Sequence, residues 1–195
     1  MGCTKDVLGQ GSCREKEDAL RTALERGRSE RVMWTDRSRL EDRSVGAAVA
    51  WWVDGGWRGR GTYLGTNKEV FDTEGFAILQ AIRLLSELGE RGQAYTIFSD
   101  SQAAVSRVQH SDCGPAQALA RAAIDFSYKL RQRNSITVWW TLAHAGVEGN
   151  EQADAVAKRA AAREEGRADP EYLREASLSH LTRKTTKARS SDTGD

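Results

Sequence analysis

The chain has 195 residues, 39% of them hydrophobic, and its 29 Lys and Arg residues nearly balance its 28 Asp and Glu residues. This fits one globular domain with modest extensions, and the net charge of +1 gives no indication of a nucleic-acid partner. The three cysteines form neither a disulfide framework nor a CxxC zinc pattern, and no apolar run resembles a membrane span or a secretory signal. We therefore expect an intracellular protein, cytoplasmic or nuclear, with no membrane partner.

The first part of the chain predicts one helix and then strands. Residues 14–27 show a short amphipathic pattern, which we expect to be a surface helix or a linker. Strand-like runs follow at 31–36, 45–56 and 57–65. The Asp-Gly-Gly sequence at 54–56 is a turn signal, so these strands are expected to form an antiparallel meander.

The remainder alternates helices and strands. The predicted helices are 69–89, 101–109, 114–133 and 149–166, and the predicted strands are 93–100 and 135–143. Pro115 lies near the start of the third of these helices, and Asn150 is the expected N-cap of the last.

This order of elements, β-β-β-α-β-α-α-β-α, predicts an α/β layered domain: a mixed sheet with helices on its faces. We place the domain at residues 30–163. Residues 1–29 are expected to be a charged extension with a short helix, and residues 164–195 a polar tail.

Four acidic residues stand out by position: Asp36, Glu74, Asp100 and Asp154. Taken singly, each has a simpler interpretation as a turn residue, a helix cap or an acidic residue near a helix N-terminus. Glu74 fits this least well, because it lies on the apolar stripe of its helix, where an ionised carboxylate needs a cation partner.

Considered together, the four carboxylates point to a metal site. The carboxyl ends of strands and the adjacent helix N-termini form the usual ligand crevice of a layered domain. Carboxylates that converge there repel one another and need a divalent cation, and oxygen ligands favour Mg²⁺ or Mn²⁺. Two such ions about 4 Å apart would suit in-line phosphoryl displacement.

Four sequence segments also resemble a known family. WTDRS, DTEGFAI, FSDSQAAV and HAGVEGNEQADAVAK are similar, in order and spacing, to the four signatures of the ribonuclease H family, over residues 31–162. The closest resemblance is to the ribonuclease H domain of fungal non-LTR retrotransposon polyproteins. It implies a three-layer fold whose five-stranded mixed sheet has three antiparallel strands and then parallel additions, with helices on both faces. It also implies Mg²⁺-dependent hydrolysis of the RNA strand of RNA/DNA hybrids, with two ions for which Mn²⁺ can substitute.

The resemblance assigns roles to individual residues. Asp36, Glu74, Asp100 and Asp154 become the catalytic metal ligands, with Asp36 bridging both ions. His144 becomes a mobile-loop histidine that assists proton transfer or product release. Gly146 and Gly149 are expected to let this loop bend. Contacts to the hybrid are expected from Ser101 and Gln102, at a helix N-terminus suited to phosphate, and from Ser38 and Asn150.

The chain departs from the family pattern at two positions and has an unusual helical glycine. Arg37 stands where the family usually has glycine, and Leu142 stands where it often has proline. Gly75 lies inside a predicted helix, where glycine costs about 1 kcal/mol of stability relative to alanine. By strand alternation, Arg37 should point to the face opposite Asp36. We expect its charge to weaken metal binding, so that Arg37→Gly raises cleavage.

Two other interpretations stay open. The chain could be a catalytically impaired remnant of a larger reverse-transcriptase polyprotein that at most binds nucleic acid. It could also be a related 3′–5′ exonuclease, although such an enzyme would have Asp-x-Glu where residues 36–38 are Asp-Arg-Ser.

Overall fold

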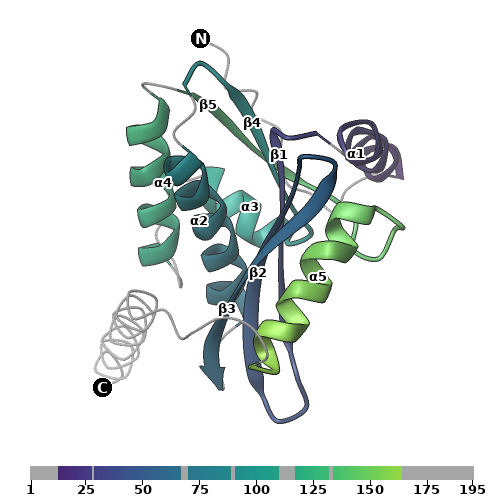
Figure 1. The fold of residues 1–195 in the computed structure, drawn as a ribbon, viewed down its shortest axis with the longest axis vertical. Helices are drawn as coiled ribbons and strands as arrows, with labels where there is room; N and C mark the ends of the chain where they lie inside the picture. Colours follow the sequence, from purple (N-terminus) through teal and green to yellow (C-terminus); the bar gives the residue numbers. More distant parts are fainter. Residues whose placement is uncertain are drawn as a thin grey trace, which may run out of the picture.

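The computed structural model describes residues 13–27, 29–66, 70–88, 91–109, 117–131 and 134–163 (Figure 1). The elements in chain order are α1 (Cys13–Arg26), β1 (Val32–Arg39), β2 (Ser44–Val53), β3 (Gly56–Thr66), α2 (Val70–Leu88), β4 (Ala94–Ser99), α3 (Gln102–Gln109), α4 (Gln117–Arg131), β5 (Ser135–Trp140) and α5 (Glu148–Ala161). Every helix and strand expected up to residue 163 is present. Pro115 and the polar tail at 164–195 lie outside the described residues.

The five strands form one mixed sheet in the order β3-β2-β1-β4-β5. The pairs β1–β2 and β2–β3 are antiparallel, whereas β1–β4 and β4–β5 are parallel. Asp54 and Gly55, with φ of 51° and 74°, form the tight turn between β2 and β3. The predicted meander and the predicted five-stranded mixed sheet are therefore confirmed.

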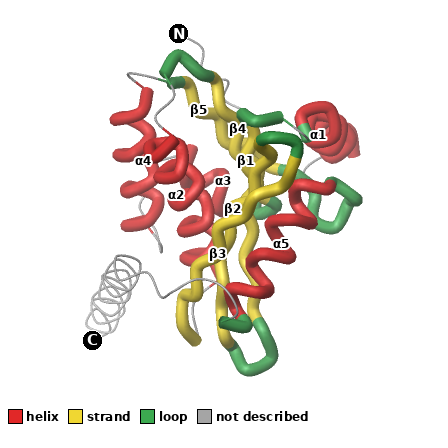
Figure 2. The backbone as a smooth tube through the Cα atoms, viewed as in Figure 1, coloured by secondary structure: helices red, strands yellow, loops and turns green. Residues whose placement is uncertain are grey.

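Helices cover both faces of this sheet (Figure 2). Helices α2, α3 and α4 lie on one face, and α1 and α5 lie on the other (Figure 1). Alternate side chains of β1 pack against the helices on the two faces of the sheet, because successive side chains of a strand point to opposite faces. Met33 belongs to the cluster that contains α2, and Trp34 to the cluster shared with α1 and α5. This is the predicted three-layer arrangement.

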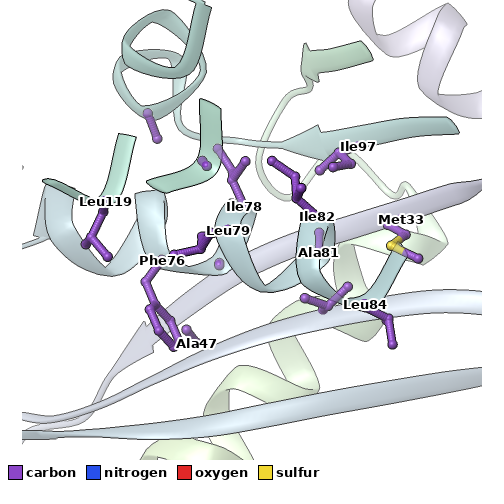
Figure 3. Close-up of a cluster of buried hydrophobic side chains, with 14 of the residues drawn as sticks. Met33, Ala47, Phe76, Ile78, Leu79, Ala81, Ile82, Leu84, Ile97 and Leu119 are labelled. Carbon is purple, nitrogen blue, oxygen red and sulfur yellow. The ribbon is translucent and has the colours of Figure 1, made fainter. Parts of the chain in front are cut away.

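Helix α2 supplies the largest part of the core (Figure 3). Its buried side chains form a broad stripe around the helix, which faces both the sheet and α4. The buried apolar residues of this stripe are Phe76, Ala77, Ile78, Leu79, Ala81, Ile82, Leu84 and Leu85. This stripe fixes the rotation of α2, and with it the direction in which Glu74 projects.

Helix α5 lies unusually close to β2 because small residues face each other. A Cβ atom on Gly46 would overlap the backbone of Ala157 and Ala161. The buried Ala157 and Ala160 present only methyl groups at this contact. The close approach holds α5 firmly against the centre of the sheet.

Helix α1 packs against the sheet beside α5. Ala23 has no exposed surface and clusters with Trp34 and Phe98. The Arg26 side chain donates a hydrogen bond from Nη1 to Thr96 Oγ1 at 2.8 Å. Of the two expectations for this segment, a surface helix or a linker, the structure shows a docked surface helix. No described helix has the length and apolar character needed to cross a membrane.

Candidate metal centre

Asp36 and Asp100 are brought together by the register of two parallel strands. Thr35 of β1 pairs with Ser99 of β4, so the next residue of each chain, Asp36 and Asp100, lies at the same level. The Thr35 hydroxyl donates to the Phe98 carbonyl at 3.0 Å and helps to hold this register. The sheet itself therefore positions two of the predicted carboxylates.

Glu74 reaches the same place from the second turn of α2. One carboxylate oxygen each from Asp36, Glu74 and Asp100 lie within 4.8 Å of one another. Asp36 and Glu74 are buried, and Asp100 is half-buried. We call these three residues the carboxylate trio.

Burial and mutual repulsion make the trio reluctant to ionise. Burial, followed by the charge of Asp100, raises the pKa of Asp36 to about 8. The same two causes raise the pKa of Glu74 to about 7. Burial also raises the pKa of Asp100. A divalent cation would relieve both the lost hydration and the repulsion.

A hard divalent cation fits the donor set. All three side chains offer carboxylate oxygens, which are the ligands that Mg²⁺ and Mn²⁺ prefer. Glu74 Oε2 is buried and has no hydrogen-bond partner among the described residues. A buried carboxylate oxygen left without a partner costs free energy, and a metal ion would supply the missing interaction.

Asp154, the fourth predicted ligand, lies on α5 at the margin of the trio. Its charge is close enough to raise the pKa values of Asp36 and Asp100. Its Oδ2 atom, however, forms an ion pair with Lys158 Nζ at 2.6 Å. Sequence reasoning overlooked this pair, although the spacing of four residues within a helix indicates it.

Arg37 forms the other ion pair at this site. Its Nε atom donates to Glu74 Oε1 at 3.0 Å. This contact with α2 lies on the side of the sheet where Met33 packs, which is the side that strand alternation predicts for Arg37. Nothing near Arg37 in the sequence indicates that Glu74 projects from this side.

The loop between β5 and α5 carries His144. Its side chain is exposed, and its φ of 51° is a left-handed conformation that few non-glycine residues adopt. Its charge lowers the pKa of Asp100, which places it near the trio. Gly146, with φ of 72°, bends the loop as expected.

The expectation that Gly149 bends the loop is wrong. Gly149 lies inside α5 and packs against Trp34 so closely that a Cβ atom would overlap the indole ring. The expected N-cap is also wrong: α5 begins at Glu148 with Val147 as its N-cap, and Asn150 lies within the first turn. Gly149 therefore allows close packing of α5 against Trp34 and does not act as a bend in the loop.

The four predicted substrate-binding residues occupy different settings. Ser101 is half-buried, and its hydroxyl accepts a hydrogen bond from the Ala104 amide at 3.3 Å at the start of α3. Gln102 is the first residue of α3 and is half-buried. Ser38 and Asn150 are buried. Ser101 thus caps α3, and the Asp100 carboxylate belongs to the trio.

Comparisons with known proteins agree with this geometry. The family model described as RNase H matches residues 28–162. Among solved structures, RNase H1 from the halophilic archaeon Halobacterium salinarum is 17% identical, with a TM-score of 0.53 over 68% of this chain and 97% of that one.

Two further structures are similar to the same extent. The N-terminal RNase H domain of rv2228c from Mycobacterium tuberculosis, solved as a maltose-binding-protein fusion, is 17% identical, with a TM-score of 0.54 over 68% of this chain and 96% of that one. LC11-RNase H1, solved in complex with an RNA/DNA hybrid, is 16% identical, with a TM-score of 0.54 over 68% of this chain and 97% of that one. At these identities the likeness establishes the fold. No curated protein sequence matches the chain significantly.

Proposed function

The chain belongs to the RNase H family, and we propose that it is an endonuclease that hydrolyses the RNA strand of RNA/DNA hybrids with Mg²⁺, for which Mn²⁺ can substitute. The observation that carries this proposal is the carboxylate trio, with three oxygens within 4.8 Å of one another at the end of two parallel strands. A cluster with raised pKa values and an unpartnered buried oxygen suits metal-assisted hydrolysis better than a structural role.

In this proposal the trio and Asp154 would hold two divalent ions, and Asp36 would serve as a ligand of both. The bound ions would supply a nucleophile from water and stabilise the charge on the scissile phosphate. Asp154 becomes available as the fourth ligand when it leaves Lys158, which is exposed and therefore weakly held. The charge of Asp154 is close enough to raise the pKa values of Asp36 and Asp100, which supports this role.

His144 is proposed to assist proton transfer or product release. Its imidazole is exposed, and its charge already acts on Asp100, so it lies at the edge of the site that faces solvent. The left-handed backbone conformations of His144 and Gly146 set the path of the loop that carries this imidazole.

For substrate, we propose a hybrid recognised through its backbone and 2′-hydroxyl groups with little sequence preference. Ser101 and Gln102 at the start of α3 are proposed to receive a phosphate, with Ser38 and Asn150 as further contacts. A structural neighbour, LC11-RNase H1, has been solved in complex with an RNA/DNA hybrid.

The origin of the chain is a further part of the proposal. The motif resemblance described above supports descent from a fungal non-LTR retrotransposon, in which the domain was once part of a larger reverse-transcriptase polyprotein.

A second candidate function is that of an impaired remnant which at most binds nucleic acid. The Arg37–Glu74 ion pair favours this candidate, because Arg37 contacts a proposed metal ligand directly. Leu142 and Gly75 are the other departures that support attenuation.

An assay on strand-labelled duplexes separates the two candidates. The protein is incubated with Mg²⁺ and an RNA/DNA hybrid, an RNA duplex or a DNA duplex of the same sequence. The proposed enzyme cuts only the RNA strand of the hybrid. Binding of the hybrid without any cut would favour the remnant, and equal cutting of the DNA duplex would contradict the proposed substrate.

A further inference from the structure

Arg37 touches two of the three carboxylates of the trio. Its side-chain Nε donates to Glu74 Oε1 at 3.0 Å, and its backbone amide donates to Asp36 Oδ1 at 2.6 Å. The arginine side chain is 27% exposed and that of Glu74 only 8%, so the ion pair is largely shielded from water. An ion pair in this setting is stronger than one on the surface.

The guanidinium acts on the cluster as a cation. Its charge and its hydrogen bond lower the pKa of Glu74, against the larger effect of burial. Its charge also lowers the pKa of Asp100. Arg37 therefore already performs part of the charge neutralisation that a metal ion would provide.

A metal ion and this guanidinium cannot both be accommodated without a cost. Two cations a few ångströms apart in a partly buried site repel each other, and one of the two oxygens of Glu74 is already engaged. We propose that Arg37 is an internal counter-ion of the carboxylate trio that competes with the divalent metal, so that metal binding displaces its guanidinium from Glu74. The inference rests on the metal site of the proposed function.

The pair between Lys158 and Asp154 provides an internal comparison. It is shorter, at 2.6 Å, but the lysine side chain is 58% exposed and that of Asp154 is 22% exposed. Water and salt screen such a pair, and a lysine so exposed can move away at little cost. Arg37 is therefore the stronger competitor, and removing Lys158 should have the smaller effect on metal affinity.

The test measures metal binding without nucleic acid. Mn²⁺ is titrated calorimetrically into metal-free protein carrying Arg37→Ala, Arg37→Gln, Arg37→Lys or Lys158→Ala. The control is Arg39→Ala, which removes the same charge from an exposed position on the same strand. Arg37→Ala and Arg37→Gln should tighten Mn²⁺ binding about five- to tenfold, the order expected for removing one nearby like charge. Arg37→Lys and Arg39→Ala should remain within about twofold of the wild type.

Thermal unfolding provides a second readout that needs no activity. Without metal, Arg37→Ala should lower the Tm, because Glu74 loses its counter-ion. In saturating Mg²⁺ the Tm of the variant should equal the Tm of the wild type measured in the same Mg²⁺, since the metal then neutralises the same carboxylate. A simple packing defect would persist in Mg²⁺, and Arg37→Gln, which keeps a polar side chain without charge, covers the case in which the alanine variant does not fold.

The outcomes distinguish failure of the counter-ion inference from failure of the metal site. If the wild type binds Mn²⁺ and neither neutral Arg37 variant binds it more tightly than Arg39→Ala does, the counter-ion inference is overturned and the metal site stands. If neither the wild type nor any variant binds Mn²⁺, and Asp100→Asn behaves identically, then the proposed metal site fails and the inference fails with it.

Discussion

Asp36 in β1 and Asp100 after β4 lie at the same level because the parallel register pairs Thr35 with Ser99. They come from segments far apart in the sequence, and burial followed by the charge of Asp100 raises the pKa of Asp36. Glu74 from α2 completes the carboxylate trio.

The stability of the metal-free protein should depend on pH through Asp36. Its pKa rises from 3.8 to about 8 on folding. The folded protein therefore retains a proton that the unfolded chain releases between these values. This stabilisation is fully present below pH 3.8 and is lost as the pH rises through about 8.

Urea unfolding in the presence of a chelator measures this effect. The free energy of unfolding of the wild type should fall between about pH 5 and about pH 9, and Asp36→Asn should reduce the fall because the amide does not ionise. Asp125→Asn, an exposed change on α4, should leave the wild-type slope unchanged. Parallel pH profiles for wild type and Asp36→Asn would contradict the raised pKa.

His144→Ala should slow cleavage without abolishing it. In the proposed mechanism the carboxylates and the metal would supply most of the charge stabilisation, so loss of the imidazole should cost about a hundredfold, near the lower end for proton-transfer groups. Single-turnover and multiple-turnover rates on the hybrid separate chemistry from product release. Complete inactivity, with the fold and metal binding intact, would show that His144 has more than an assisting role.

Gly75→Ala should stabilise the protein by about 0.5–1 kcal/mol, because alanine is the better helix former. A Cβ atom at Gly75 would meet only Leu119 Cβ, at 3.9 Å, which is an ordinary contact. Urea unfolding measures the change. Gly46→Ala is the matched control, since its Cβ atom would overlap the α5 backbone and should destabilise the fold strongly. A loss of stability in Gly75→Ala comparable to that of the control would mean that the packing of α2 against α4 has no room for a methyl group at residue 75.

Helix α1 should contribute to the stability of the domain. Ala23 has no exposed surface, so Ala23→Glu buries an unpaired charge and should destabilise the protein by more than about 3 kcal/mol. Leu24 is 57% exposed, and Leu24→Glu should change stability by no more than about 0.5 kcal/mol. Equal effects of the two substitutions on chemical unfolding would show that α1 is not docked as the structure has it.

The sequence was sufficient to predict the order of the elements and the mixed sheet. Period-two and period-3.6 patterns and the turn at Asp54 and Gly55 are local signals, and they report the elements directly. Asp36 and Asp100 could be found because each ends an apolar strand run or lies within one. Their proximity then follows from the topology that these elements imply.

The remaining details depend on contacts between distant segments. The pair between Arg37 and Glu74 joins residues 37 positions apart, and it depends on the rotation of α2. Gly149 was misinterpreted as a hinge because nothing near it in the sequence indicates the indole of Trp34. Docking of α1 likewise depends on Ala23 meeting Trp34 and Phe98 in space. Local patterns carry no information on such contacts.

Strand-specific cleavage of a labelled RNA/DNA hybrid in Mg²⁺ tests the central claim most directly. The wild type, Asp100→Asn and the control Asp125→Asn are compared at equal concentrations of folded protein. The wild type and Asp125→Asn should cut the RNA strand at the same rate. Asp100→Asn should be slower by more than the roughly 10- to 100-fold that is typical of losing an outer-shell partner of a metal. Wild-type cleavage by Asp100→Asn would contradict the assignment of the carboxylate trio as the catalytic metal site.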